Sequence, residues 1–125
     1  MKTEVRNENG YCRVIATCNI KKGEIVSHIA GTTIITPSKY TIQLNEDQHL
    51  ESLSNDPNDP QYAWRFINHS CEPNCSIDVL EKNVIAWQDI KSGSEITFDY
   101  NTTETELTAP FVCECGSTRC MGTIR

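Results

Sequence analysis

The chain has 125 residues, of which 38% are hydrophobic and 22% charged, enough for one compact domain with a modest core. Its net charge of −6, from 11 basic and 17 acidic side chains, argues against direct nucleic-acid binding, which needs a surface that neutralises phosphates. No apolar run approaches the roughly 20 residues that span a bilayer, and no apolar leader is present, so we expect no membrane association. A reducing intracellular compartment, cytoplasm or nucleus, is the expected location.

The N-terminal half is rich in β-branched residues and broken by turns. Lys21-Lys22-Gly23 predicts a turn, Gly31 interrupts a strand, and Pro37 ends another. The strands expected here cover residues 12–17, 24–29, 32–36 and 40–44.

The C-terminal half begins with a loop at residues 54–60 that is dense in turn-forming residues, and a single helical turn is expected over 62–67. Residues 76–80 and 83–87 flank a short polar turn and predict a hairpin, and a further strand is expected over 95–98. Residues 102–108 are polar and predicted to be a mobile loop. No segment has a long 3.6-residue apolar period, so the sequence predicts a mainly β fold of short strands with little helix.

Seven cysteines are many for such a chain, and an odd number cannot all pair within it. Cys113, Cys115 and Cys120 place three thiols within eight residues, a spacing typical of zinc ligands. Zinc takes four ligands at tetrahedral corners, so a fourth must come from elsewhere, with Cys71 and Cys75 as the main candidates. The alternative is that these cysteines are buried or free thiols. The isolated Cys12 and Cys18 are expected to be small core residues.

Three segments carry the functional signal. The first is Arg65-Phe66-Ile67-Asn68-His69-Ser70-Cys71-Glu72-Pro73-Asn74, the second is Glu95-Ile96-Thr97-Phe98-Asp99-Tyr100, and the third is the cysteine tail. In this order they resemble SET-domain protein lysine methyltransferases with a zinc-binding post-SET tail. The resemblance implies a β-clip-like SET fold of small sheets with a pseudoknot over residues 1–108, and a post-SET tail over 109–125 packed on it.

The resemblance also implies roles for individual residues. Asn68 and His69 look like the pair that holds S-adenosylmethionine, and Phe66 belongs to the lead-in to that loop, beside the cofactor. Tyr100 looks like the catalytic tyrosine, with Phe98 lining the lysine channel beside it. For the one structural Zn²⁺, the resemblance selects Cys71 as the fourth ligand, with Cys113, Cys115 and Cys120.

The N-terminal part departs from the family pattern. Tyr11 and Arg13 occupy the two positions of the usual Gly-x-Gly, where glycine lets the backbone approach the cofactor. We include both as cofactor-binding candidates, with Arg13 a hypothetical partner of the cofactor carboxylate. The stretch between Gly31 and Arg65 is short for the family, which indicates loose substrate selection or a groove completed by a second subunit in a homodimer.

The resulting hypothesis is an S-adenosylmethionine-dependent protein-lysine N-methyltransferase that acts on a basic protein or peptide such as a histone tail. The acidic balance of the chain permits such a substrate. Two alternatives stay open. One is a catalytically weak SET-like module that binds a peptide without turnover. The other is a zinc-stabilised interaction domain in which Asn68, His69 and Tyr100 are only structural.

Overall fold

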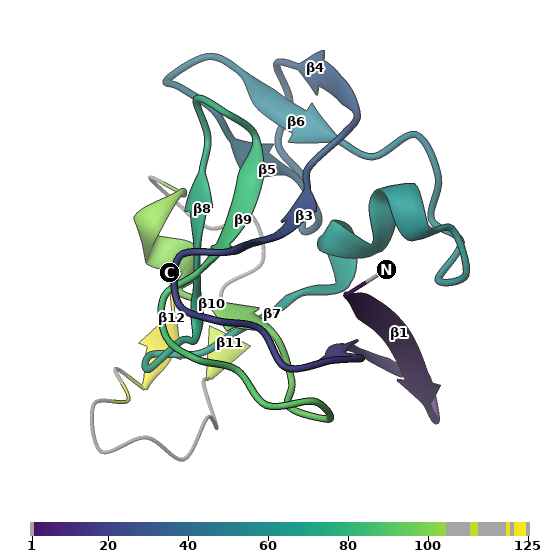
Figure 1. Ribbon diagram of the computed structural model, residues 1–125. Coiled ribbons are helices and arrows are strands. Elements are labelled where there is room, and N and C mark those ends of the chain that lie inside the picture. The colour runs from purple at the N-terminus through teal and green to yellow at the C-terminus, as the bar shows by residue number, and fades with distance from the viewer. Residues whose placement is uncertain (1, 105–110, 113–119, 121, 125) are drawn as a thin grey trace.

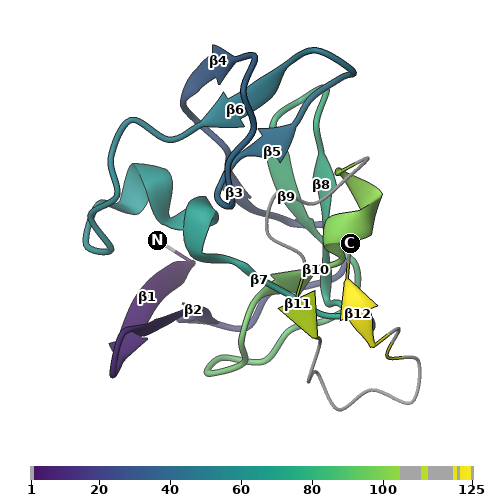
Figure 2. The same ribbon diagram turned by 180° about the vertical axis from the view of Figure 1, so that it is seen from behind.

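The computed structural model describes residues 2–104, 111–112, 120 and 122–124. Within these ranges the chain forms short strands in five small sheets and two 3₁₀ helices, as the mainly β prediction requires. The β4–β6–β5 sheet lies at one end of the molecule, and the β1–β2 hairpin and the β11–β12 pair lie at the other (Figures 1 and 2). The β3–β9–β8 sheet lies between them.

An antiparallel hairpin of β1 (Thr3–Glu8) and β2 (Tyr11–Ala16) opens the chain. Its two turn residues have positive φ, 55° at Asn9 and 86° at Gly10, which is the backbone that Asn-Gly favours in a two-residue hairpin turn. The second strand was predicted from its apolar residues. The first was not, although the Asn-Gly pair was a readable signal for it.

The central antiparallel sheet has the order β3–β9–β8, with β3 at Ile25–His28, β8 at Cys75–Asp78 and β9 at Asn83–Ala86. Lys82 adopts a φ of 57° in the turn that joins the last two strands. The predicted hairpin is confirmed. Its alternating inward residues, such as Val84 and Ala86, are buried in the core.

A second antiparallel sheet has the order β4–β6–β5, with β4 at Thr32–Ile34, β5 at Ile42–Gln43 and β6 at His49–Glu51. The strand predicted over 40–44 is thus shorter than expected. The strand β6 was not predicted, because its three residues include only one aliphatic side chain, Leu50, and no alternation to detect.

The 3₁₀ helix η1 (Pro60–Phe66) supplies the predicted helical turn. Asp59 caps it, accepting a hydrogen bond from Gln61 N–H at 3.1 Å, and Pro60 fits the first helical position because its nitrogen needs no partner there. The buried Trp64 donates from its indole nitrogen to the Ala30 carbonyl at 2.9 Å, which fixes the helix against the chain leaving β3.

Three further elements end the described chain: a parallel pair of β7 (Asn68–His69) with β10 (Thr97–Phe98), the 3₁₀ helix η2 (Tyr100–Thr102), and an antiparallel pair of β11 (Phe111–Val112) with β12 (Thr123–Ile124). The parallel pair joins two segments far apart in the sequence, as the expected pseudoknot requires. Cys18 is exposed, so its assignment to the core was wrong. No helix in the described ranges is long and apolar enough to cross a membrane.

Candidate active site

The two central motif segments meet through the parallel strands β7 and β10. Asn68 lies beside Thr97 and His69 beside Phe98, and the pairing continues where Ser70 N–H donates to the Phe98 carbonyl at 3.2 Å. Backbone hydrogen bonds of this kind hold the two segments side by side. The predicted cofactor residues are therefore placed next to the predicted lysine channel.

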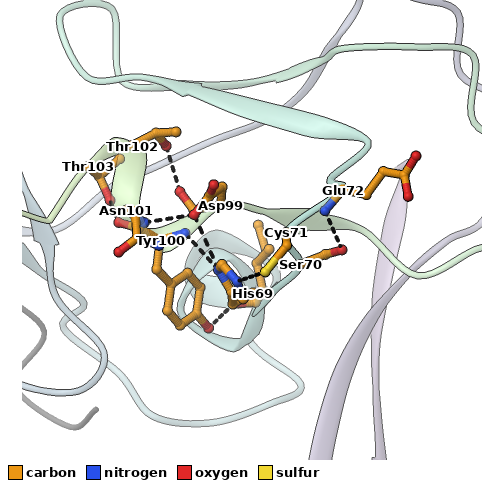
Figure 3. Close-up of polar contacts among 10 residues, drawn as sticks. His69, Ser70, Cys71, Glu72, Asp99, Tyr100, Asn101, Thr102 and Thr103 are labelled. Atoms are coloured by element: carbon orange, nitrogen blue, oxygen red, sulfur yellow. Dashed lines mark hydrogen bonds and ion pairs between the residues drawn. The ribbon is translucent and has the colours of Figure 1, made fainter. Parts of the chain in front are cut away.

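Tyr100 is held by its hydroxyl and by its ring. The hydroxyl donates to the Ile67 carbonyl at 2.7 Å. The centroid of the ring lies 5.3 Å from that of the His69 ring, which is drawn beside it in Figure 3, and 5.0 Å from that of the Phe98 ring. Burial raises the pKa of Tyr100 well above its ordinary value, and the nearby Tyr11 raises it further. The phenol is neutral at physiological pH, and its oxygen can still accept a hydrogen bond.

His69 joins the tyrosine segment to the cysteine loop. Its Nδ1 accepts a hydrogen bond from Tyr100 N–H at 3.0 Å, so in the neutral ring the proton lies on Nε2. That nitrogen faces Cys71 Sγ at 3.3 Å (Figure 3). Burial lowers the pKa of His69, and Asp99, with Oδ1 at 3.5 Å from Nδ1, only partly opposes this. His69 is therefore a neutral donor to the Cys71 sulfur.

Asp99 positions the start of η2 and was not predicted as a site residue. Its carboxylate accepts from Asn101 N–H at 2.9 Å, which caps the helix, and its carbonyl accepts from the Thr102 hydroxyl at 2.6 Å. These two hydrogen bonds fix the backbone on both sides of Tyr100 and hold it at the first position of η2. An aspartate directly before the tyrosine was the readable signal for this cap.

Asn68 is oriented by two acceptors. Its Nδ2 donates to the Cys12 carbonyl at 2.9 Å and to Glu95 Oε2 at 3.0 Å. Because both neighbours can only accept, the amide nitrogen must face them, which turns the Asn68 carbonyl oxygen away from them. The side chain is half-buried, so this oxygen is available to a donor that enters the site.

Glu95 and Asn74 form a supporting layer that sequence reasoning missed. Asn74 donates from Nδ2 to the Glu95 carbonyl at 2.8 Å and accepts from Thr97 N–H at 3.0 Å. It thus ties the loop after His69 to the strand that carries Phe98. Both residues lie inside the motif segments, but their partners depend on the parallel pairing.

Phe66 belongs to an aromatic cluster on the side of the β4–β6–β5 sheet. Its ring lies 6.4 Å from that of Tyr40, and the Arg65 guanidinium lies 4.3 Å from the Tyr40 ring and 5.4 Å from the Phe66 ring. Arg65 also donates to Ser52 Oγ at 2.9 Å and to the Ser54 carbonyl at 3.2 Å. The cluster therefore anchors Tyr40 and the loop after β6 beside Phe66.

The SET domain family matches residues 12–101. This chain belongs to the SET-domain family. Histone-lysine N-methyltransferase ASHH2 of Arabidopsis thaliana is 46% identical over 66 residues, a match that covers 48% of this chain and 4% of the relative. The histone-lysine N-methyltransferase, H3 lysine-36 specific, of Mus musculus is 33% identical over 126 residues, covering 83% of this chain and 5% of the relative. The chain thus spans a small part of these proteins.

The SET fold is also that of solved structures. Two crystal structures of KRYPTONITE with SAH, one with mCHG DNA and the other with mCHH DNA and H3(1-15) peptide, match with TM-scores of 0.73 and 0.70. Their sequence identities are 22% and 23%, and the matches cover 97% of this chain and 28% and 29% of those chains. At this identity the likeness establishes the fold.

Tyr11 and Arg13, where the SET pattern led us to expect glycine, lie on β2. Tyr11 is 57% exposed, and Arg13 forms an ion pair with Glu8 across the hairpin. Glu95, which holds Asn68, lies within electrostatic reach of both side chains. One of the two glycine positions therefore carries an arginine that is paired with Glu8, and the backbone carbonyl of Cys12 between the two positions accepts from Asn68.

The cysteines considered as zinc ligands differ in their surroundings. Cys71 and Cys120 are half-buried and pack against the same buried residue, Ile124. Cys75 is buried in the core, where burial raises the pKa of its thiol to about 12. Cys113 and Cys115 lie outside the described residues. Within the described ranges alone, no group of three or more His, Cys, Asp or Glu side chains is arranged to hold a metal ion.

Proposed function

We propose that the chain is an S-adenosylmethionine-dependent protein-lysine N-methyltransferase acting on a basic, histone-like protein tail. The single observation that carries the proposal is the placement of Tyr100. A neutral phenol, fixed by Ile67 and packed on Phe98, lies beside Asn68 and His69 in a chain that belongs to the SET-domain family. The two relatives described above are histone-lysine N-methyltransferases.

The cofactor would be held by Asn68, His69, Phe66, Tyr11 and Arg13. When bound, S-adenosylmethionine supplies an electrophilic methyl group on its sulfonium centre. The open carbonyl oxygen of Asn68 suits an ammonium group, because Glu95 and the Cys12 carbonyl hold the amide nitrogen on the other side. Arg13 suits the cofactor carboxylate once it exchanges its partner Glu8 for it.

The substrate lysine would reach the Tyr100 hydroxyl, with Phe98, whose ring packs against that of Tyr100, as part of the channel lining. A free lysine has a pKa of about 10.4, and an apolar channel lowers it by disfavouring the charged form. The Tyr100 oxygen would then accept a hydrogen bond from the neutral amine while the Tyr100 hydroxyl continues to donate to the Ile67 carbonyl. This contact aligns the nitrogen lone pair with the methyl group, and alignment lowers the barrier of an in-line displacement.

A zinc-binding tail over residues 109–125, packed on a SET domain over 1–108, completes the proposal. Cys71, Cys113, Cys115 and Cys120 would supply the four thiolates, and the structure fits this set at the two ligands it describes. Cys71 and Cys120 converge on Ile124, and His69 points an N–H at the Cys71 sulfur, which suits a thiolate. Cys75 does not fit, because its buried thiol resists ionisation. Reduced thiols require a reducing compartment, cytoplasm or nucleus.

The test is calorimetric titration of S-adenosylmethionine into the zinc-loaded chain, followed by transfer of a labelled methyl group to a histone H3 tail peptide. We expect micromolar binding that Asn68→Ala abolishes and the matched Asn58→Ala, an exposed asparagine, retains. Binding without transfer to any lysine peptide or basic protein would contradict the enzyme proposal.

A second candidate, a SET-like peptide-binding module without turnover, is favoured by Arg13 at a glycine position, where it pairs with Glu8. Glu8→Gln separates the two. If Arg13 serves the cofactor, releasing it should tighten S-adenosylmethionine binding, whereas a module that never binds the cofactor shows no heat with either protein. A homodimer that completes the peptide groove is tested in the same samples by sedimentation.

A further inference from the structure

Glu104 joins the segment that carries Tyr100 to the β4–β6–β5 sheet. Its backbone N–H donates to the Tyr100 carbonyl at 3.0 Å, one turn before it. Its Oε2 accepts from Gln43 N–H, in the end strand β5, at 2.9 Å. Gln43 and Glu104 are 61 residues apart in the sequence. The Glu104 carboxylate is therefore held between the segment that carries Tyr100 and the β4–β6–β5 sheet.

Among the described residues, the charge of this carboxylate has no cationic partner. The ion pairs formed by described residues do not include Glu104, and its Oε1 has no hydrogen-bond partner among them. The nearby Arg65 is engaged with Tyr40 and the serines after β6. Glu104 is half-buried, so water screens its charge only in part.

The charge also acts at the proposed transfer site. Among the described residues, two carboxylates act on Tyr100 and raise its pKa: Glu95, which holds Asn68, and Glu104, which is bonded to the sheet. Glu95 is occupied by Asn68. Of these two carboxylates, Glu104 is the one held beside the β4–β6–β5 sheet, through Gln43 N–H.

We propose that Glu104 is a specificity-determining residue that selects substrates with an arginine or lysine close to the target lysine. The inference rests on the proposed methyltransferase function. The open oxygen of the carboxylate accepts a charge-assisted hydrogen bond from the neighbouring cation of the substrate, while the other oxygen stays on Gln43 N–H. A hydrogen bond to a charged group at a half-exposed site is expected to change kcat/KM by roughly fivefold to tenfold.

Glu104→Gln is the informative variant because it separates charge from structure. Its amide oxygen can still accept from Gln43 N–H, so the link to β5 is kept while the negative charge is lost. Glu104→Arg reverses the charge. Glu46→Gln, at an exposed glutamate in the turn after β5, removes the same charge from the same end of the sheet and is the matched control.

The experiment compares peptides that share one target lysine and carry arginine, glutamine or glutamate beside it. Methyl transfer and peptide binding, by fluorescence anisotropy, are measured separately on the full zinc-loaded chain. We expect the wild type and Glu46→Gln to prefer the arginine peptide, Glu104→Gln to lose most of that preference through KM, and Glu104→Arg to favour the glutamate peptide.

An unchanged arginine preference in both Glu104 variants would overturn the inference while leaving the methyltransferase proposal intact. Conversely, a preference in peptide binding that depends on Glu104, found without any methyl transfer, would support the inference and contradict the proposed activity. Absence of any preference in the wild type would also overturn the inference.

Discussion

His69 offers the sharpest test of the site, because its two ring nitrogens serve different partners. In His69→Asn, the side-chain oxygen can take the place of Nδ1 and accept from Tyr100 N–H, but the shorter side chain cannot replace the Nε2 donor to Cys71. In His69→Gln, the amide nitrogen can take the place of Nε2 and donate to the Cys71 sulfur, but Tyr100 N–H loses its acceptor.

The expected magnitudes follow from what each bond does. A hydrogen bond to a charged group contributes about 1.5–3 kcal/mol, and loss of a group that orients a metal ligand costs about 10–100-fold in affinity. Since His69 is buried, solvent screening does not reduce this figure much. We therefore expect His69→Asn to weaken zinc binding by about 10–100-fold. His69→Gln should keep most of the zinc affinity, and its free energy of unfolding should fall by about 1 kcal/mol because the hydrogen bond from Tyr100 N–H to Nδ1 is removed.

Zinc affinity is measured by competition with a chromophoric chelator, and the thiolate charge-transfer band of the cobalt-substituted protein reports the ligand set. Urea unfolding of each zinc-loaded variant gives its stability. Wild-type zinc affinity in His69→Asn, or equal losses in the two variants, would refute the assignment of the Nε2 proton and its role toward Cys71.

Three other predictions follow from individual contacts. Tyr100→Phe removes the hydroxyl that donates to the Ile67 carbonyl, so we expect the free energy of unfolding in urea to fall by about 1–2 kcal/mol. Turnover should fall at least a hundredfold with little change in cofactor affinity. Unchanged turnover would contradict the role of the hydroxyl. Gly31→Ala places a Cβ 2.0 Å from a backbone oxygen of β6 and should lower the free energy of unfolding by more than about 2 kcal/mol. The control is Gly93→Ala, where φ is 91° and no atom lies within 4 Å of the added Cβ, so that only backbone strain of about 1 kcal/mol is expected. Equal effects would show that the close approach is relieved. Burial raises the pKa of the Cys75 thiol to about 12, above the ordinary value of about 8.5, so its contribution to stability is complete below pH 8.5 and lost as pH rises toward 12. Cys75→Ala should therefore reduce the dependence of the unfolding free energy on pH in this range. An unchanged slope would refute the assignment.

Local chemistry explains where sequence reasoning succeeded. Turn-forming residues and alternating apolar residues predicted the β8–β9 hairpin and the strand β3, because both signals depend on neighbours in the chain. The Asn9-Gly10 turn was a signal of the same kind that was overlooked. Cys18 was misassigned because the strand β2 ends at Ala16, so Cys18 lies in the bend that follows it, where its side chain is exposed.

The order and spacing of the motifs around Asn68 and Tyr100 were enough, by themselves, to indicate the family and its candidate residues. Only the tertiary structure decided how those residues are held. The proton of His69, the orientation of the Asn68 amide, the Glu8–Arg13 pair and the link from Glu104 to Gln43 each depend on a partner in another segment of the chain. Hydrogen bonds are directional and short-ranged, so partners distant in the sequence cannot be assigned until the parallel and antiparallel pairings have brought them within about 3 Å.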